Sequence, residues 1–264
     1  MTANSSAPRG IDHTPVSGRA AQAYWDIKAA TYPRPDEAHA QARAERLRQL
    51  ALRCGVRFDV ARVLDLGAGT GVHAAAIARH ARQVVALDLS ATMLEPLARL
   101  ALPNVETHAL DWSEVDLDAR GWRGNFDLVW AAMTPLAGAP ELIAKLEAAS
   151  RGQCCAITWG GERSDPVIEQ AFALHGVAFR APRWSEALAD HLSGREVRRA
   201  SLEQSSERQI PVADLLADVS AHLRWLGIVP DMTALQAWAR AIAIDGHVGR
   251  RQRARLDCRV WRVD

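Results

Sequence analysis

The chain has 264 residues, of which 48% are hydrophobic and 24% are charged, and its formal net charge is +1 at pH 7. This length suits one α/β domain with additions, or one domain with a small subdomain. The balanced charge gives no reason to expect nucleic acid or a membrane as partner, and four cysteines without C-x-x-C spacing favour a cytoplasmic protein without a disulfide framework.

The first 60 residues are expected to form a tail and a cap. Residues 1–18 are rich in Ser, Pro, Gly and Ala, which is typical of a flexible tail. Residues 19–60 are predicted to form an N-terminal helical cap. Its helices are expected over 20–30 and 39–54, and prolines break the chain between them.

Residues 61–160 are predicted to form the core of the fold. A short apolar strand runs from Val63 to Leu66, and glycines follow at positions 67, 69 and 71. Glycines at this spacing let the backbone turn sharply and let a ligand approach the bare main chain. The segment 72–81 reads as a helix whose unpaired N–H groups point back at the turn. This pattern predicts a nucleotide-cofactor site at the carboxyl end of the first strand.

Further strands in the core are expected to alternate with helices, as a parallel sheet requires. Three of them end at residues that can carry chemistry, and a fifth is closed by two glycines. These strands span 83–88, 105–110, 126–131 and 153–159.

Residues 161–264 are expected to add a helical lid and the final strands. The predicted helices cover 166–175, 184–191, 212–225 and 233–244. One or two strands are expected over 196–210, and the alternating segment 253–263 is predicted to be the last strand.

The glycine loop fits two classes of cofactor. Read from Gly69, the chain matches the G-x-G-x-x-G/A pattern of dinucleotide sites, with Ala74 in the last place. Read from Asp65, it gives D-x-G-x-G-x-G. A carboxylate before the first glycine faces a pyrophosphate unfavourably but suits a cofactor that carries an ammonium group and a sulfonium. Asp88 is expected to bind ribose hydroxyls in either case.

Four ordered segments resemble motifs of the class I S-adenosylmethionine (SAM)-dependent methyltransferases of the small-molecule type. They are the loop from Asp65, the D-x-S-x-x-M-L segment from Asp88, the pair Asp111-Trp112, and the F-D-x-V segment from Phe126. Together they fall within residues 60–137. The resemblance implies an α/β Rossmann-like doubly wound sheet of seven strands with the last strand antiparallel. It also implies a helical cap before the core, a helical insertion before the last strand, and SAM as cofactor.

The resemblance also implies which residues hold the cofactor. Asp65 would meet the amino-acid end of SAM, and Gly67, Ala68 and Gly69 would give close backbone approach. Asp88 would hold the ribose. Further contacts are implied from Leu89 on the adenine, Asp111 on its amino group, Trp112 beside the ring, Ala131 near the methionine portion, and Tyr24 and Tyr32 from a segment folded over SAM.

Several alternatives stay open at this stage. Asp111 could simply cap a helix, and the two tyrosines could simply pack on the core. No catalytic residue is evident, and the histidines show no metal-ligand grouping. The predicted activity is methyl transfer to a small molecule by positioning of the reactants, in a monomer or a homodimer. The rivals are an NAD-dependent oxidoreductase and a SAM-binding protein without catalysis.

Overall fold

The computed structural model describes residues 18–59, 61–179 and 184–263, and it divides them into two compact units. The larger unit comprises the described residues up to 160 together with 184–202 and 256–263. The smaller unit comprises 161–179 and 203–255. Apart from Gly18, the tail expected over residues 1–18 lies outside the described part of the chain.

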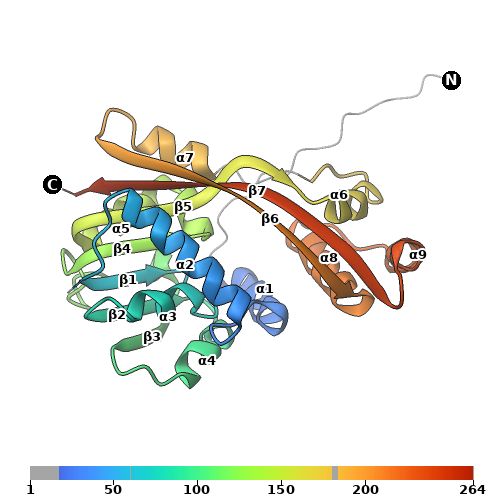
Figure 1. The fold of residues 1–264 in the computed structure, drawn as a ribbon, viewed down its shortest axis with the longest axis horizontal. Coiled ribbons are helices and arrows are strands. Elements are labelled where there is room, and N and C mark those ends of the chain that lie inside the picture. Colours follow the sequence, from blue (N-terminus) through green and yellow to red (C-terminus); the bar gives the residue numbers. More distant parts are fainter. Residues whose placement is uncertain (1–17, 60, 180–183, 264) are drawn as a thin grey trace. The chain divides into compact units, whose positions relative to one another are not determined.

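The described residues form a seven-stranded sheet in the order β3-β2-β1-β4-β5-β7-β6 (Figure 1). Strands β1 to β5 are paired in parallel, and the last strand is antiparallel, as expected. The strands are β1 Arg62–Leu66, β2 Gln83–Asp88, β3 Val105–Ala109, β4 Phe126–Ala132, β5 Ser150–Ser164, β6 Val197–Pro211 and β7 His247–Arg262.

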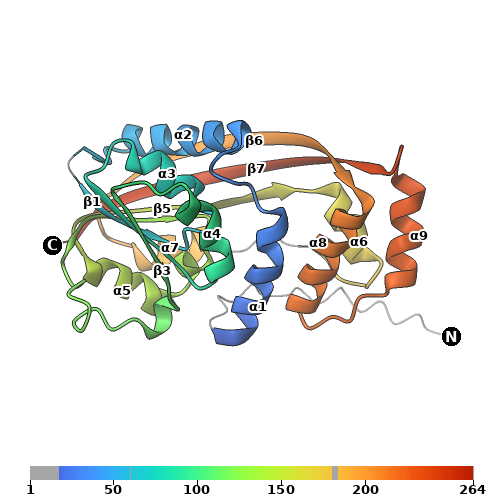
Figure 2. The ribbon, with the colours of Figure 1, turned by 90° about the horizontal axis from the view of Figure 1, so that it is seen from below.

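Helices cover both faces of the sheet in the larger unit (Figure 2). Helices α2, α3 and α4 pack on one face, and α5 and α7 pack on the other. The helices of this unit are α1 Gly18–Lys28, α2 Ala38–Arg53, α3 Val72–Ala78, α4 Ala91–Arg99, α5 Pro140–Ala149 and α7 Trp184–His191, with 3₁₀ turns η1 Ala29–Thr31, η2 Trp112–Glu114 and η3 Pro135–Gly138.

The strands of the larger unit are apolar on both sides because both faces are covered. In β1, Val63 belongs to the core beneath α2 and α3, whereas Leu64 belongs to the core beneath α5. Cys154 and Cys155 likewise fall in opposite cores, as their adjacency in a strand predicts. This double covering leaves the ends of the strands as the places where a ligand can approach the sheet.

The smaller unit has a core of its own. Its helices are α6 Pro166–Ala173, α8 Val212–Trp225 and α9 Met232–Ile242. Phe172, Leu215, Leu235 and Val248 are buried together there. Asp165, which is fully buried, caps α6 and accepts hydrogen bonds from Arg250 Nη2 at 2.6 Å and Nε at 2.9 Å.

Three predicted strand boundaries were wrong. Strand β5 continues through Gly160 and Gly161 to Ser164, because Gly161 adopts a positive φ of 89° within the strand instead of ending it. The segment 196–210 forms a single strand, and β7 begins at His247, six residues before the expected start at Arg253. These extensions belong to the smaller unit, where pairing between neighbouring strands decides their length.

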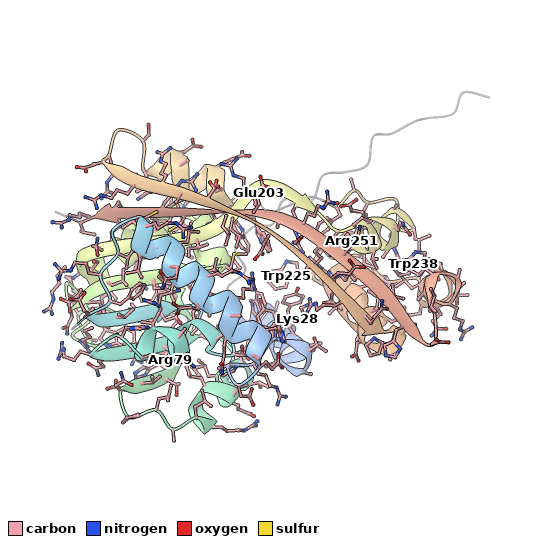
Figure 3. All side chains as sticks on the ribbon, in the orientation of Figure 1. Lys28, Arg79, Glu203, Trp225, Trp238 and Arg251 are labelled. Carbon is pink, nitrogen blue, oxygen red and sulfur yellow. The ribbon has the colours of Figure 1, made fainter. Side chains whose placement is uncertain are left out.

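The buried ion pair should dominate the stability of the smaller unit. Asp165→Ala strands the Arg250 charge in the interior, and we expect it to lower the free energy of unfolding by about 3–5 kcal/mol. Glu207→Ala is the matched control, since Glu207 pairs with the exposed Arg251 of β7 (Figure 3) and should cost about 1 kcal/mol or less. Urea unfolding measures both, and equal losses in the two variants would contradict this account.

Candidate functional site

The order of the strands fixes where a ligand can bind. Strand β1 pairs with β2 on one side and with β4 on the other, so the chain changes direction across the sheet between β1 and β4. In open α/β sheets, ligands bind in the crevice outside the carboxyl ends of the strands at such a point. Asp65 near the end of β1 and Asp88 at the end of β2 lie at this edge.

The loop from β1 to α3 is shaped by three glycines with positive φ. The values are 68° at Gly67, 56° at Gly69 and 83° at Gly71. A side chain at Gly67 would clash with Thr134, and one at Gly71 would clash with Leu97. At Gly69 the only neighbour of an added Cβ is the ring of Tyr32, at 4.0 Å. The middle of the loop therefore stays open, while its two ends are packed against the protein.

Asp65 is a buried acid without a basic partner among the groups that set its pKa. Its side chain is 2% exposed, and its Oδ2 has no hydrogen-bond partner. Burial, followed by the nearby charge of Asp88, raises the pKa of Asp65 to about 8, although the N–H of Ala74 donates a hydrogen bond to the carboxylate. The carboxyl is consequently protonated at neutral pH until a cation comes close to it.

Asp88 has protein donors on both carboxylate oxygens. The N–H of Gly69 donates to Oδ2 at 2.8 Å, and the N–H of Ser90 donates to Oδ1 at 2.9 Å. Burial raises the pKa of Asp88 above its usual range, against these two hydrogen bonds, and the charge of Asp26 adds to the increase. Asp88 thus joins the glycine loop to the start of α4, where Ser90 caps the helix as expected. Each carboxylate oxygen accepts more than one hydrogen bond, so Asp88 can still accept from a ligand.

Asp111 acts as a helix cap in this structure, the alternative that the sequence left open. Its Oδ1 accepts from the N–H and hydroxyl of Ser113, and its Oδ2 accepts from the N–H of Gly18 at 2.8 Å. Partial burial opposes ionisation, but these donors and Lys145 outweigh it and hold the pKa of Asp111 below its usual value. The neighbouring Trp112 is 2% exposed and donates to the carbonyl of Leu142, so its indole lies within the core.

The predicted aromatic residues lie together beside the loop. The rings of Tyr24 and Trp25 are 5.0 Å apart, and those of Trp25 and Tyr32 are 6.2 Å apart, both edge to face. The hydroxyl of Thr70 donates to the carbonyl of Pro33 at 2.5 Å and fixes this segment to the glycine loop. The structure therefore brings the tyrosine segment to Gly69, which the sequence separates from it by more than 30 residues.

The remaining predicted residues are apolar and differ in exposure. Ala68 is buried, and its N–H donates to the carbonyl of Leu87 at 2.9 Å. Leu89 is half-buried just beyond the end of β2, which leaves part of its side chain open to a ligand. Ala131 is fully buried in the core beneath α5, so its backbone is the part that a ligand at the strand end could approach.

His73 lies in the first turn of α3, with its ring 5.9 Å from that of Trp130. Burial, with a contribution from Arg43, lowers the pKa of His73 to about 3. An imidazole with this pKa is neutral at physiological pH and is a poor general base. Among the described residues, no group of three or more His, Cys, Asp or Glu side chains is placed to hold a metal ion.

Two residues of the site were not foreseen as functional. Thr134 fills the space beside Gly67, and Asp26 accepts a hydrogen bond from Ser90 across 64 residues of sequence. The D-x-S-x-x-M-L segment pointed to Ser90 only as a helix cap. No local pattern reveals its partner, because Asp26 lies on α1 far away along the chain.

The buried carboxyl of Asp65 makes stability depend on pH. Its pKa is about 8 in the folded state and about 4 in the unfolded chain, so the folded state holds the extra proton between these values. The free energy of unfolding therefore falls as pH rises from about 4 to about 8. We expect Asp65→Asn to unfold at higher urea concentration than the unmodified protein at pH 8, by about 2–4 kcal/mol, with little difference at pH 4. The same difference at both pH values would contradict the assignment.

A family model described as a methyltransferase domain matches residues 63–151. This segment contains the glycine loop, Asp88, Asp111 and strand β4. A comparison with curated proteins finds no match. None of the helices in the described residues is both long enough and apolar enough to span a bilayer.

Two solved structures illustrate the similarity of fold. A putative methyltransferase from Bacillus halodurans is 16% identical with a TM-score of 0.50, over 82% of this chain and 97% of that one. The [4+2]-cyclase SpnF is 17% identical with a TM-score of 0.50, over 94% of this chain and 98% of that one. At such identities the likeness speaks for the fold, and the family model speaks for the chemistry. Residues 63–151 are therefore a methyltransferase domain of the class I, SAM-dependent type.

Proposed function

We propose that this protein binds SAM at the loop between β1 and α3 and transfers its methyl group to a nucleophilic atom of a small molecule. The observation that carries the proposal is the unpartnered Oδ2 of Asp65, buried at the start of a glycine loop whose middle is open. A buried carboxylate without a partner is costly unless a ligand completes it. The ammonium group of SAM is the complement that the cofactor of this family offers.

The residues present fit the rest of the cofactor. Asp88 would accept hydrogen bonds from the ribose hydroxyls, and the backbone of Gly69 would lie against the ligand. Asp111 would accept from the adenine amino group, in addition to the N–H of Gly18 or in its place. Tyr24 and Tyr32 would cover the ligand from the side of the open loop.

The protein's share of the chemistry is to position the reactants. SAM supplies a methyl group on a sulfonium, which a nucleophile attacks in line. A base is needed only where the nucleophile carries a proton that it cannot lose to water. His73 does not meet that need at neutral pH, because its pKa is about 3. The proposal therefore assigns this chain the binding and alignment of two ligands, without a catalytic triad.

The dinucleotide alternative is disfavoured by charge. A pyrophosphate bound at the glycine loop would lie beside Asp65 and Asp88, and ionised phosphates close to carboxylates are repelled. The non-catalytic alternative has an observation in its favour, since a structure with this fold is described as a cyclase. Methyl transfer is preferred because the matching family model is that of a methyltransferase domain.

Binding of SAM and S-adenosylhomocysteine (SAH), measured by calorimetric titration, tests the cofactor site. We expect both to bind, and we expect Asp88→Ala to weaken the binding of each by about 1–3 kcal/mol through lost ribose hydrogen bonds. Glu207→Ala, which alters the smaller unit, serves as control and should bind as the unmodified protein does. Binding of NAD alone would instead support the oxidoreductase, and equal affinity in Asp88→Ala would remove Asp88 from the site.

The raised pKa of Asp65 predicts that binding is linked to proton release. Because the ammonium of SAH favours the ionised carboxylate, binding at pH 6–7.5 should expel a proton from Asp65. Affinity should then rise with pH in this range, by up to about tenfold per unit. Titration in buffers of different ionisation enthalpy measures the proton released. Asp65→Asn should abolish the release, and an affinity for SAH that does not depend on pH would contradict the prediction.

A further inference from the structure

The segment that begins with α1 is fastened to the candidate cofactor site at three points. At its start, the N–H of Gly18 donates to Asp111. In its middle, Asp26 accepts from the hydroxyl of Ser90 at 2.5 Å. Beyond its end, the carbonyl of Pro33 accepts from Thr70. All these residues belong to the larger unit, and each core partner is, or adjoins, a residue proposed to hold the cofactor.

The middle contact leads directly to Asp88. A serine hydroxyl has one proton, and here Ser90 gives it to Oδ1 of Asp26. The oxygen of the same hydroxyl accepts from the N–H of Met93 at 3.0 Å, which caps α4. The N–H of Ser90 donates to Oδ1 of Asp88. Asp26 thus fixes the rotamer of a residue whose own backbone holds the proposed ribose ligand.

Burial makes these orientations matter. Ser90 is fully buried, and Asp88 is 8% exposed, so water has little access to substitute for a lost partner. Removing Asp26 would release the Ser90 hydroxyl to turn toward another acceptor. A buried polar network that is only partly satisfied loses its unique geometry.

The presence of Asp26 is unfavourable for stability alone. It is an acid on α1 that lies close enough to Asp88 to raise the pKa of that carboxyl. Like charges close together cost free energy, and such arrangements are concentrated at functional sites. A neutral side chain could pack α1 against α4 without this cost.

We propose that Asp26 is a positioning residue for the cofactor. Through Ser90 it holds Asp88 in the orientation that accepts the ribose hydroxyls, and it thereby couples α1 to the occupied site. This inference rests on the proposed function of Asp88. It assigns a role in ligand binding to a helix that the family match, over residues 63–151, does not include.

Calorimetric titration with SAH tests the role of Asp26. We expect Asp26→Ala to bind SAH about tenfold more weakly, as the loss of one charge-assisted hydrogen bond predicts. Asp26→Asn keeps an oxygen that accepts from Ser90 and should recover most of the affinity. In Asp26→Ala/Ser90→Ala, the effect should not exceed that of Ser90→Ala, because both substitutions break the same chain of contacts. The matched control is Asp36→Ala, which removes an exposed acid and should bind normally.

The outcomes separate the inference from the proposed function. If the unmodified protein does not bind SAH, the proposed function fails and this inference fails with it. If it binds SAH and Asp26→Ala binds equally well, only the inference is overturned. An Asn variant as weak as the Ala variant would also overturn it, since the hydrogen bond would then not be what matters.

A second measurement uses the unmodified protein and needs no variant to fold. Amide hydrogen exchange over residues 19–28 reports how firmly α1 is held. The inference expects SAH to slow exchange in this helix as well as in the loop from Gly67 to Gly71. Slower exchange in the loop with no change in α1 would overturn the coupling.

Discussion

The structure depends on a pair of carboxylates that the protein itself leaves without a counter-charge. Asp65 and Asp88 lie near the carboxyl ends of neighbouring strands, and each raises the cost of ionising the other's surroundings through burial and like charge. Backbone N–H groups of Gly69, Ser90 and Ala74 offset part of this cost. One oxygen, Oδ2 of Asp65, has no partner at all. A cationic ligand resolves this arrangement, and the opposite charge on a ligand would worsen it.

The rest of the larger unit serves to hold that pair in place. Apolar cores on both faces of the sheet fix β1 and β2, so the acids cannot move apart to relieve their repulsion. The ends of the glycine loop are packed against Thr134 and Leu97, while its middle is open beside Tyr32. Helix α1 adds a further layer of control, because its Asp26 reaches Asp88 through Ser90. Rigidity at the edges and openness at the centre are what a preformed cofactor site requires.

Fold and chemistry are separate questions in this protein. The sheet order and the two cores recur in a structure described as a methyltransferase and in one described as a cyclase. The specific chemistry depends on the acids at the strand ends and on what the second ligand meets. The smaller unit, with its own core and the buried pair of Asp165 and Arg250, is stabilised independently of those acids.

The sequence by itself determined the strand order's first half, the glycine loop and the positions of Asp65 and Asp88, because these depend on short patterns of apolar residues, glycines and acids. It also predicted that Ser90 caps α4 and that Cys154 and Cys155 face opposite cores. Only the tertiary structure decided that β5 runs on through its glycines and that the indole of Trp112 is enclosed in the core. The same holds for the contact from Asp26 to Ser90, since two residues 64 positions apart meet only when the helices that carry them pack. Local patterns record backbone preferences, whereas pairing and burial depend on neighbours that no local pattern contains.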